Sequence, residues 1–198
     1  MNHYDIKQQY INDNFFIKDA KGVSGGILIV DIIDNKNIIL LGKPNIKKRE
    51  HEYESFGGKK EDYDITSLHT AIREFIEEFF NIKLSTNDIN MLAIYIRQQN
   101  LIVKQHDFYG ISYMINFNGL NQIYQKICDI QKDSNLYKYN INNNFDVNKY
   151  IDERIITEIP VDGLNEIKSI HLFNIEDIKM NKIKLRWYTK KIISKMIK

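Results

Sequence analysis

Apolar residues near the start of the chain form two blocks separated by a polar turn. Gly26–Ile33 has a β-branched majority and one polar interruption, and Ile38–Leu41 is wholly apolar. Between the two blocks, Asp34-Asn35-Lys36-Asn37 supplies the residue types that favour tight turns. The pattern predicts two buried strands joined as a hairpin. The charged stretch Gly42–Ser55 then predicts a loop that leads to a short strand near Phe56.

Residues 68–79 have the periodicity of a helix with one apolar face and one acidic face. With about 100° between successive residues, the apolar side chains fall within an arc of about 140°. Three glutamates fall on the opposite side, within about 100°. The apolar face comprises Leu68, Ala71, Ile72, Phe75, Ile76 and Phe79, and the acidic face comprises Glu74, Glu77 and Glu78.

The second half of the chain alternates β-rich and irregular stretches. Its least structured part by composition, an Asn-rich region over about residues 119–160, is expected to be an insertion before the last core strand. The expected elements are strands within Met91–Arg97 and Ile102–Phe117, a helix over Asn121–Gln131, a last strand over Ser169–Phe173 and a closing helix over Asn181–Lys198.

This order of elements predicts the fold class and the domain organisation. Strands, one helix, more strands and a terminal helix indicate an α/β fold in which helices pack on a mixed sheet. No repeat or linker divides residues 1–198, so we expect a single domain. No apolar run approaches the roughly 20 residues of a membrane span. Cys128 is the only cysteine, which is typical of a reducing compartment. We therefore expect a cytoplasmic chain without a membrane partner.

Charge is distributed unevenly along the chain. The formal net charge is only +2, but residues 181–198 carry seven cations and no anion. The remainder is therefore acidic overall. A basic terminal helix can contact a polyanion such as RNA, although lysines on the solvated face of an amphipathic helix are also common.

The glutamates of residues 74–78 are the strongest candidates for chemistry. Like charges at i, i+3 and i+4 repel on one helix face, and a divalent cation held by carboxylate oxygens would offset that repulsion. Hard oxygen ligands suit Mg²⁺ or Mn²⁺. Immediately upstream, Gly57 and Gly58 allow a close approach of backbone to a ligand. A solvated acidic face is the alternative explanation.

Gly58 through Ile82 resembles the signature of the Nudix hydrolases. That signature reads Gly, five residues, Glu, seven residues, Arg-Glu, an apolar residue, any residue, Glu-Glu, any residue, Gly and an apolar residue. This chain supplies Gly58 and the block Arg73-Glu74-Phe75-Ile76-Glu77-Glu78 within residues 57–82. The resemblance implies an α/β/α sandwich and hydrolysis of a diphosphate linkage within a nucleotide derivative.

The chain departs from the signature at three points. The early acid is Asp64, Glu61 or Asp62 in different alignments, and which of them pairs with the arginine is open. The closing glycine is absent, and Asn81 is the next residue suited to the left-handed position that ends a helix. Finally, Phe56 stands where a proline is common before the glycine pair.

The resemblance also implies the roles of individual residues. Mg²⁺ or Mn²⁺ would be held by Glu74, Glu77, Glu78 and the Gly58 carbonyl, Arg73 would orient the glutamates, and Glu78 is the first choice of general base. The family often supplies a further acid before its last core strand. Glu166 occupies such a position, with Glu158 and Asp162 as rivals.

The substrate is less well defined by the sequence than the reaction. Candidate contacts are Gly57, Lys43, Lys59 and the aromatic Phe56, and Tyr53, Phe108, Tyr109 and Tyr113 are either core residues or a sandwich for a base. A capped RNA bound through the basic C-terminal helix is one expectation, because messenger-RNA decapping Nudix enzymes of large DNA viruses are similar in their nonstandard helix ending. A catalytically silent nucleotide- or RNA-binding module and a diphosphoinositol polyphosphate hydrolase are the alternatives. The oligomeric state stays open.

Overall fold

The predicted hairpin opens the part of the chain that the computed structural model describes, residues 24–106, 110–132 and 135–196. It consists of β1 (Ser24–Ile33) and β2 (Lys36–Pro44). The two residues between the strands, Asp34 and Asn35, have φ angles of 49° and 60°. A two-residue turn of this type needs positive φ at both positions, which Asp and Asn tolerate. The hairpin and its turn are confirmed.

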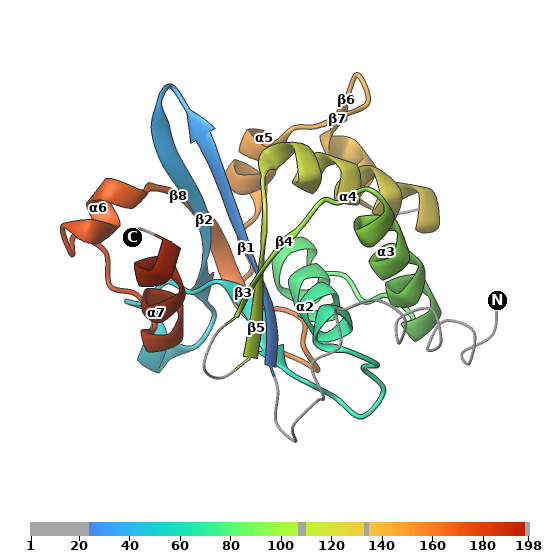
Figure 1. Cartoon of the computed structure of the whole chain (residues 1–198), viewed down its shortest axis with the longest axis horizontal. Helices are drawn as coiled ribbons and strands as arrows, with labels where there is room; N and C mark the ends of the chain where they lie inside the picture. The colour runs from blue at the N-terminus through green and yellow to red at the C-terminus, as the bar shows by residue number, and fades with distance from the viewer. Residues whose placement is uncertain (1–23, 107–109, 133–134, 197–198) are drawn as a thin grey trace.

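The hairpin belongs to a mixed sheet with β1 at its centre (Figure 1). The other strands of this sheet are β3 (Phe56–Lys59), β4 (Val103–His106), β5 (Gly110–Ile115) and β8 (Ile167–Asn174). The strand order is β4-β5-β1-β2-β8, and β3 also pairs with β1. β1 and β5 run parallel, whereas the other pairs of this sheet are antiparallel. The predicted mixed sheet and the predicted last strand are both confirmed.

Helices cover both faces of the sheet and give three layers. On one face lie α2 (Ser67–Phe75), α3 (Thr86–Gln98) and α4 (Phe117–Ile130), and on the other lie α6 (Ile175–Lys179) and α7 (Trp187–Met196) (Figure 1). Successive side chains of a strand point to opposite faces. Accordingly Ile27 and Ile29 of β1 join the core beneath α2, whereas Leu28 joins the core beneath α7. The α/β/α arrangement is thus built by one strand that is buried on both sides.

The strand predicted at Met91–Arg97 is wrong, because these residues lie within α3. The Ser85 side chain caps the start of this helix by accepting a hydrogen bond from the Asp88 backbone. The buried apolar positions of α3 have helical spacing rather than alternation. They are Ile89, Leu92, Ala93 and Ile96.

The region predicted to be an insertion, about residues 119–160, contains more helix and strand than its composition suggests. The predicted helix exists as α4 but begins earlier, at Phe117. It is followed by the 3₁₀ helix η3 (Asn135–Tyr139), the short hairpin of β6 (Asn140–Ile141) and β7 (Asn144–Phe145), and α5 (Val147–Glu153). Aromatic packing ties this region to the core: Phe145 stacks on Tyr124 with ring centroids 4.3 Å apart, and both rings lie against Phe80.

The sequence predicts a closing helix that starts at Asn181, but in the structure this helix starts at Trp187. The preceding segment is extended because it pairs with the loop before β3. The backbone N–H of Tyr53 donates to the carbonyl of Lys184, and that of Arg186 donates to the carbonyl of Tyr53, both at 2.9 Å. Within the described ranges, no helix combines the length and the apolar character that a membrane crossing requires.

Candidate active site

The acidic helix begins with a reciprocal cap and ends in a wider turn. The Thr66 side chain accepts from the backbone N–H of His69, and the His69 ring accepts from the backbone N–H of Thr66. After α2 the chain continues as one π-helical turn, η2 (Ile76–Phe80), and stops at Asn81 with φ of 55°. The predicted helix and its termination at Asn81 are confirmed. Single π turns occur frequently at functional sites.

The glutamate face of this helix is not a solvated surface. Glu77 and Glu78 are buried, and Glu74 is nearly so, because β3 and the loop before β8 cover them. All six predicted apolar positions are also buried. A helix buried on both sides must satisfy its carboxylates internally.

Arg73 is the centre of the ion pairs on one side of the helix. Its guanidinium lies 3.0 Å from the Asp64 carboxylate, 2.9 Å from Glu74 and 3.1 Å from Glu77, and it donates to the Lys59 carbonyl at 2.9 Å. Burial alone would lower the pKa of Arg73, but the hydrogen bond to Asp64 and the charges of Asp64, Glu74 and Glu77 raise it above its ordinary value. Of the three acids that the sequence left open, Asp64 is the one that pairs with Arg73. Arg73 therefore fixes the loop and the first two glutamates together.

Glu78 points to the other side, toward the glycine strand. The backbone N–H of Gly57 donates to its Oε2 at 2.6 Å. Burial raises the pKa of the Glu78 carboxyl well above its ordinary value, and the nearby carboxylates of Glu74 and Glu54 raise it further. Burial likewise raises the pKa of Glu74 to about 7, although Arg73 opposes the shift.

The paired glycines of β3 make room for these carboxylates. A Cβ atom on Gly58 would lie 2.4–2.5 Å from the carboxyl atoms of Glu74. A Cβ atom on Gly57 would lie 2.5 Å from the Cα of Gly26 in β1. Gly58 is therefore needed to make room for Glu74, and Gly57 is needed for the pairing of β3 with β1.

Of the three candidate acids before β8, Glu166 is the one that lies near both Glu74 and Glu78. It precedes β8 and contributes to the raised pKa of both Glu74 and Glu78. Asp162 instead lies beside Glu77, whose pKa it raises, and is paired with Lys83. Glu158 is exposed, and its backbone carbonyl accepts a hydrogen bond from the Asn45 side chain.

Glu54 is a member of the cluster that the sequence did not reveal. It is buried, pairs with Arg49 at 3.1 Å and with Arg186, and accepts a hydrogen bond from the Tyr188 hydroxyl at 3.0 Å. It nevertheless acts on Glu78 as a like charge. Two of these three partners, Arg186 and Tyr188, come from the C-terminal segment, so no local pattern marks Glu54 as a member of the cluster.

The cluster suits a hard divalent cation. In the part of the chain that the structure describes, no three His, Cys, Asp or Glu side chains are already arranged as a metal site. However, Glu166 lies close enough to raise the pKa of both Glu74 and Glu78, and Glu74 also raises the pKa of Glu78. Carboxylate oxygens that repel in this way are the donor set that Mg²⁺ or Mn²⁺ would stabilise.

The predicted substrate contacts differ in whether their side chains are exposed to solvent. Phe56 is wrong as a substrate contact: it is fully buried, with its ring 5.2 Å from that of Phe79, because β3 turns it into the core. Tyr113 is also a core residue. Lys59 is exposed on β3, and Lys43 is partly exposed on β2. Burial lowers the pKa of His171, and the charge of Lys43 lowers it further. Phe108 and Tyr109 lie outside the described residues.

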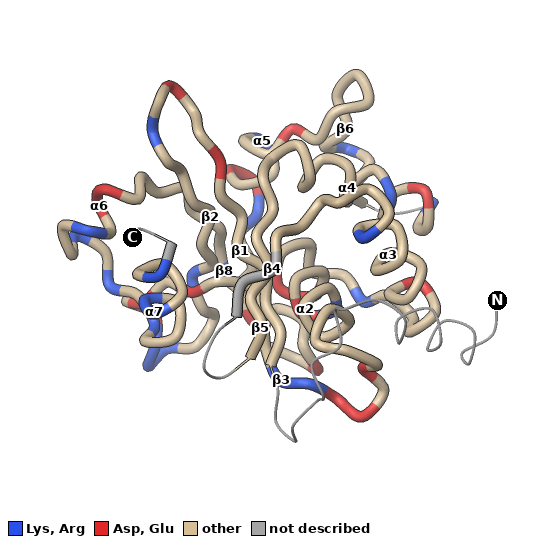
Figure 2. The backbone as a smooth tube through the Cα atoms, viewed as in Figure 1, with Lys and Arg blue, Asp and Glu red and all other residues tan. Residues whose placement is uncertain are grey.

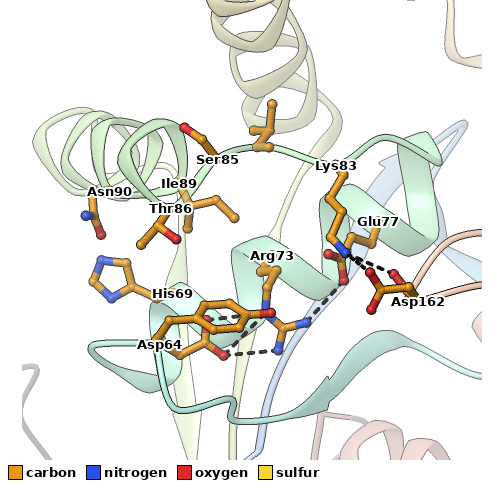
Figure 3. A pocket seen from close by; sticks show the side chains of 12 residues that line it. Asp64, His69, Arg73, Glu77, Lys83, Ser85, Thr86, Ile89, Asn90 and Asp162 are labelled. Carbon is orange, nitrogen blue, oxygen red and sulfur yellow. Dashed lines mark hydrogen bonds and ion pairs between the residues drawn. The ribbon is translucent and has the colours of Figure 1, made fainter.

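A cavity of about 400 Å³ adjoins the Arg73 side of the helix (Figure 3). Its walls include Tyr63 from the loop before α2, Arg73 and Glu77 from the acidic helix, Lys83 from the segment before α3, and Asn90 from α3. The Oδ1 atom of Asn90 is buried and has no hydrogen-bond partner among the described residues. This cavity shares Glu77 with the carboxylate cluster, and Gly57 is not among its lining residues.

The basic C-terminal segment is partly neutralised within the fold. Lys182 pairs with Asp177 at 2.8 Å, Lys184 pairs with Glu52 at 3.3 Å, and Arg186 pairs with Glu54. The Nζ atom of Lys191 lies 5.3 Å from the centroid of the exposed Trp187 ring. Exposed basic residues recur along α7 (Figure 2). They are Lys190, Lys191 and Lys195.

Solved structures of Nudix proteins are similar to this chain at low sequence identity. A MutT/Nudix family protein from Enterococcus faecalis is 12% identical with a TM-score of 0.38, and the match covers 88% of this chain and 51% of that one. The Nudix domain of Shewanella oneidensis NrtR, solved with ADP-ribose, is 9% identical with a TM-score of 0.42, covering 98% and 96%. A C. elegans Ap4A hydrolase binary complex is 12% identical with a TM-score of 0.38, covering 87% and 93%. This chain thus spans about half the length of the E. faecalis protein. No protein-family model and no curated protein matches the sequence.

Proposed function

We propose that this protein is a metal-dependent Nudix hydrolase that cleaves a diphosphate linkage in a nucleotide derivative. The observation that supports this proposal is the contact between the acidic helix and β3. The Glu78 carboxylate accepts a hydrogen bond from the Gly57 backbone, and the Glu74 carboxylate packs against Gly58. Carboxylate oxygens beside a backbone that a ligand can approach closely suit a cation and a diphosphate.

The residues that would hold the metal come from three segments. Glu74 and Glu78 lie on the helix, Glu166 lies before β8, and the resemblance adds Glu77 and the Gly58 carbonyl. Mg²⁺ or Mn²⁺, when bound, neutralises charge on the diphosphate and acidifies the attacking water. Arg73 would keep Glu74 and Glu77 in place, since it contacts both and is anchored to Asp64.

Glu78 is the proposed general base. A carboxylate takes up a proton most effectively when its pKa lies close to the working pH. Burial and the neighbouring carboxylates raise the pKa of Glu78 in that direction. The Gly57 N–H holds one of its oxygens at 2.6 Å and so fixes the orientation of the carboxylate.

A substrate panel tests the reaction. Capped RNA, dinucleoside polyphosphates, ADP-ribose, nucleoside triphosphates and inositol pyrophosphates would be incubated with Mg²⁺ or Mn²⁺ and the products identified. We expect turnover of a nucleotide derivative that Glu77→Gln and Glu78→Gln abolish and that the exposed control Glu61→Gln retains. Metal-dependent turnover that survives both substitutions would rule out this mechanism. Tight nucleotide binding without turnover would instead support a silent binding module.

Within this class, we propose capped RNA as the substrate. The exposed cations of α7 and Trp187 offer charge and an aromatic ring to a nucleic acid. Replacing Lys190 and Lys195 by alanine should raise the KM for capped RNA and weaken its salt dependence, but leave hydrolysis of a free cap dinucleotide unchanged. Lys36→Ala, at the exposed first residue of β2, is the control. Failure to release m7GDP from capped RNA would eliminate this substrate.

A further inference from the structure

The catalytic helix ends without the glycine of the Nudix signature, and its last carbonyls are capped from elsewhere. A helix leaves its final carbonyl groups without intrahelical partners. Here Nη2 of Arg154 donates to the Glu78 carbonyl at 2.6 Å, and the Tyr150 hydroxyl donates to the Phe79 carbonyl. Both donors come from the insertion, and both side chains are buried.

The two donors are built into one short helix. Tyr150 lies within α5, and Arg154 is the residue that ends it. Residues four apart share a helix face, so α5 presents a hydroxyl and a guanidinium to two successive carbonyls of the π turn. A cation at a helix C-terminus is also favoured by the helix dipole.

Arg154 reaches a second segment at the same time. Its Nη1 donates to the carbonyl of Ile167 at 2.8 Å, one residue after Glu166. The same two segments are joined again by a reciprocal amide pair: Asn81 accepts from the Asn165 backbone at 2.8 Å and donates to its side chain at 2.9 Å. The end of the acidic helix and the segment around Glu166 are thus joined twice, through Arg154 and through the Asn81–Asn165 pair.

We propose that Arg154 is a positioning residue that sets the spacing between Glu78 and Glu166. The planar guanidinium binds the main chain beside both acids at once, which a lysine ammonium cannot do with the same geometry. This inference rests on the proposed function for its catalytic consequence, but the clamp itself is a property of the fold. Tyr150 supports it by holding the next carbonyl.

The test compares Arg154→Met, Arg154→Lys and Tyr150→Phe with the full-length wild type. Lys149→Met is the matched control, because Lys149 lies on the same helix with an exposed side chain. Backbone amide exchange of residues 76–82 and 165–167 reports on the clamp without metal or substrate. Metal-induced thermal shift, kcat, KM and the Mg²⁺ concentration for half-activation report on the site.

We expect Arg154→Met to accelerate exchange at residues 76–82 and 165–167 while α3 stays protected. The metal-induced thermal shift should shrink, and kcat should fall by about tenfold to a hundredfold with a smaller change in KM, because small misplacements of catalytic groups have effects of that size. Tyr150→Phe should show the same changes to a lesser degree. Arg154→Lys should restore them only in part, and Lys149→Met should match the wild type.

Two results would overturn the inference. One is unchanged exchange and unchanged kcat in Arg154→Met. The other is full recovery in Arg154→Lys, which would reduce the clamp to a charge effect. If Arg154→Met does not fold, Arg154→Lys and Tyr150→Phe still decide between these outcomes. A wild type that hydrolyses nothing would refute the proposed function, whereas the exchange data would still decide the clamp.

Discussion

The guanidinium of Arg73 donates to the Asp64 carboxylate from Nη2 at 3.0 Å and from Nε at 3.3 Å. Both side chains are buried. Removing one member of a buried ion pair leaves the other charge without compensation. This pair therefore stabilises the loop between β3 and α2. It also holds Arg73 in the position from which its Nη1 contacts Glu74 and Glu77.

Asp64→Asn should accordingly destabilise the protein by about 3 kcal/mol, the usual cost of breaking a buried pair. Chemical denaturation would measure the free energy of unfolding. Asp62→Asn is the control, because Asp62 is exposed in the same loop. An equal loss in the two variants would mean that the Asp64 pair has no special role.

Alanine at the two motif glycines should have different consequences. At Gly57 the new methyl would meet the backbone of β1, which cannot move cheaply, so we expect a loss of about 1–3 kcal/mol in the free energy of unfolding. At Gly58 it would meet the end of the Glu74 side chain, so we expect little loss of stability and a large loss of metal-dependent turnover. Comparing the melting temperature with kcat in each variant checks this contrast, and a reversed order would contradict it.

Glu78→Gln should increase stability in alkaline solution without metal. The folded pKa of Glu78 is raised above the unfolded value near 4.5. Below that value the group is protonated in both states, and as the pH rises the unfolded state loses its proton first, which lowers the stability of the fold. Melting temperatures at about pH 4 and pH 8 should therefore agree at the lower pH and favour the variant at the higher one. A variant less stable than wild type at both would refute the sign.

Metal binding should strengthen as the pH rises through the pKa of Glu74. That pKa is raised to about 7 by burial, and a proton competes with a metal for the same carboxylate. We expect the apparent Mg²⁺ affinity to fall by about tenfold for each pH unit below this value. Titration of the metal-induced thermal shift at several pH values measures it, with Glu74→Gln as the variant in which this dependence should weaken.

Local signals in the sequence are sufficient to predict the turns and helix ends whose conformation depends on the residue at that position. Asp34 and Asn35 specify the hairpin turn, and Asn81 ends the acidic helix, because each conformation depends on the residue that adopts it. The composition of Met91–Arg97 favours a strand, whereas the cap at Ser85 makes these residues part of a helix that starts at Thr86. Helical spacing at Ile89, Leu92 and Ile96 carried the correct signal.

Long-range partners account for what the sequence could not provide. The choice of Asp64 over Glu61 depends on how the loop folds onto Arg73, and nothing in the spacing separates the two acids. The position of Phe56 beside the paired glycines predicts a substrate contact, but the direction of its side chain is set by the pairing of β3 with β1. The roles of Glu54 and Arg154 arise only after distant segments have met.

The capping of the acidic helix also orders events during synthesis. Arg154 lies 76 residues after Glu78 in the chain, and Tyr150 lies 71 residues after Phe79. At the usual elongation rate of about 5–20 residues per second, a ribosome needs roughly 4–15 s to deliver the guanidinium after the helix has emerged. Throughout that interval the nascent helix carries an unfinished end, so its carboxylates acquire their final arrangement only as the last strand of the sheet arrives.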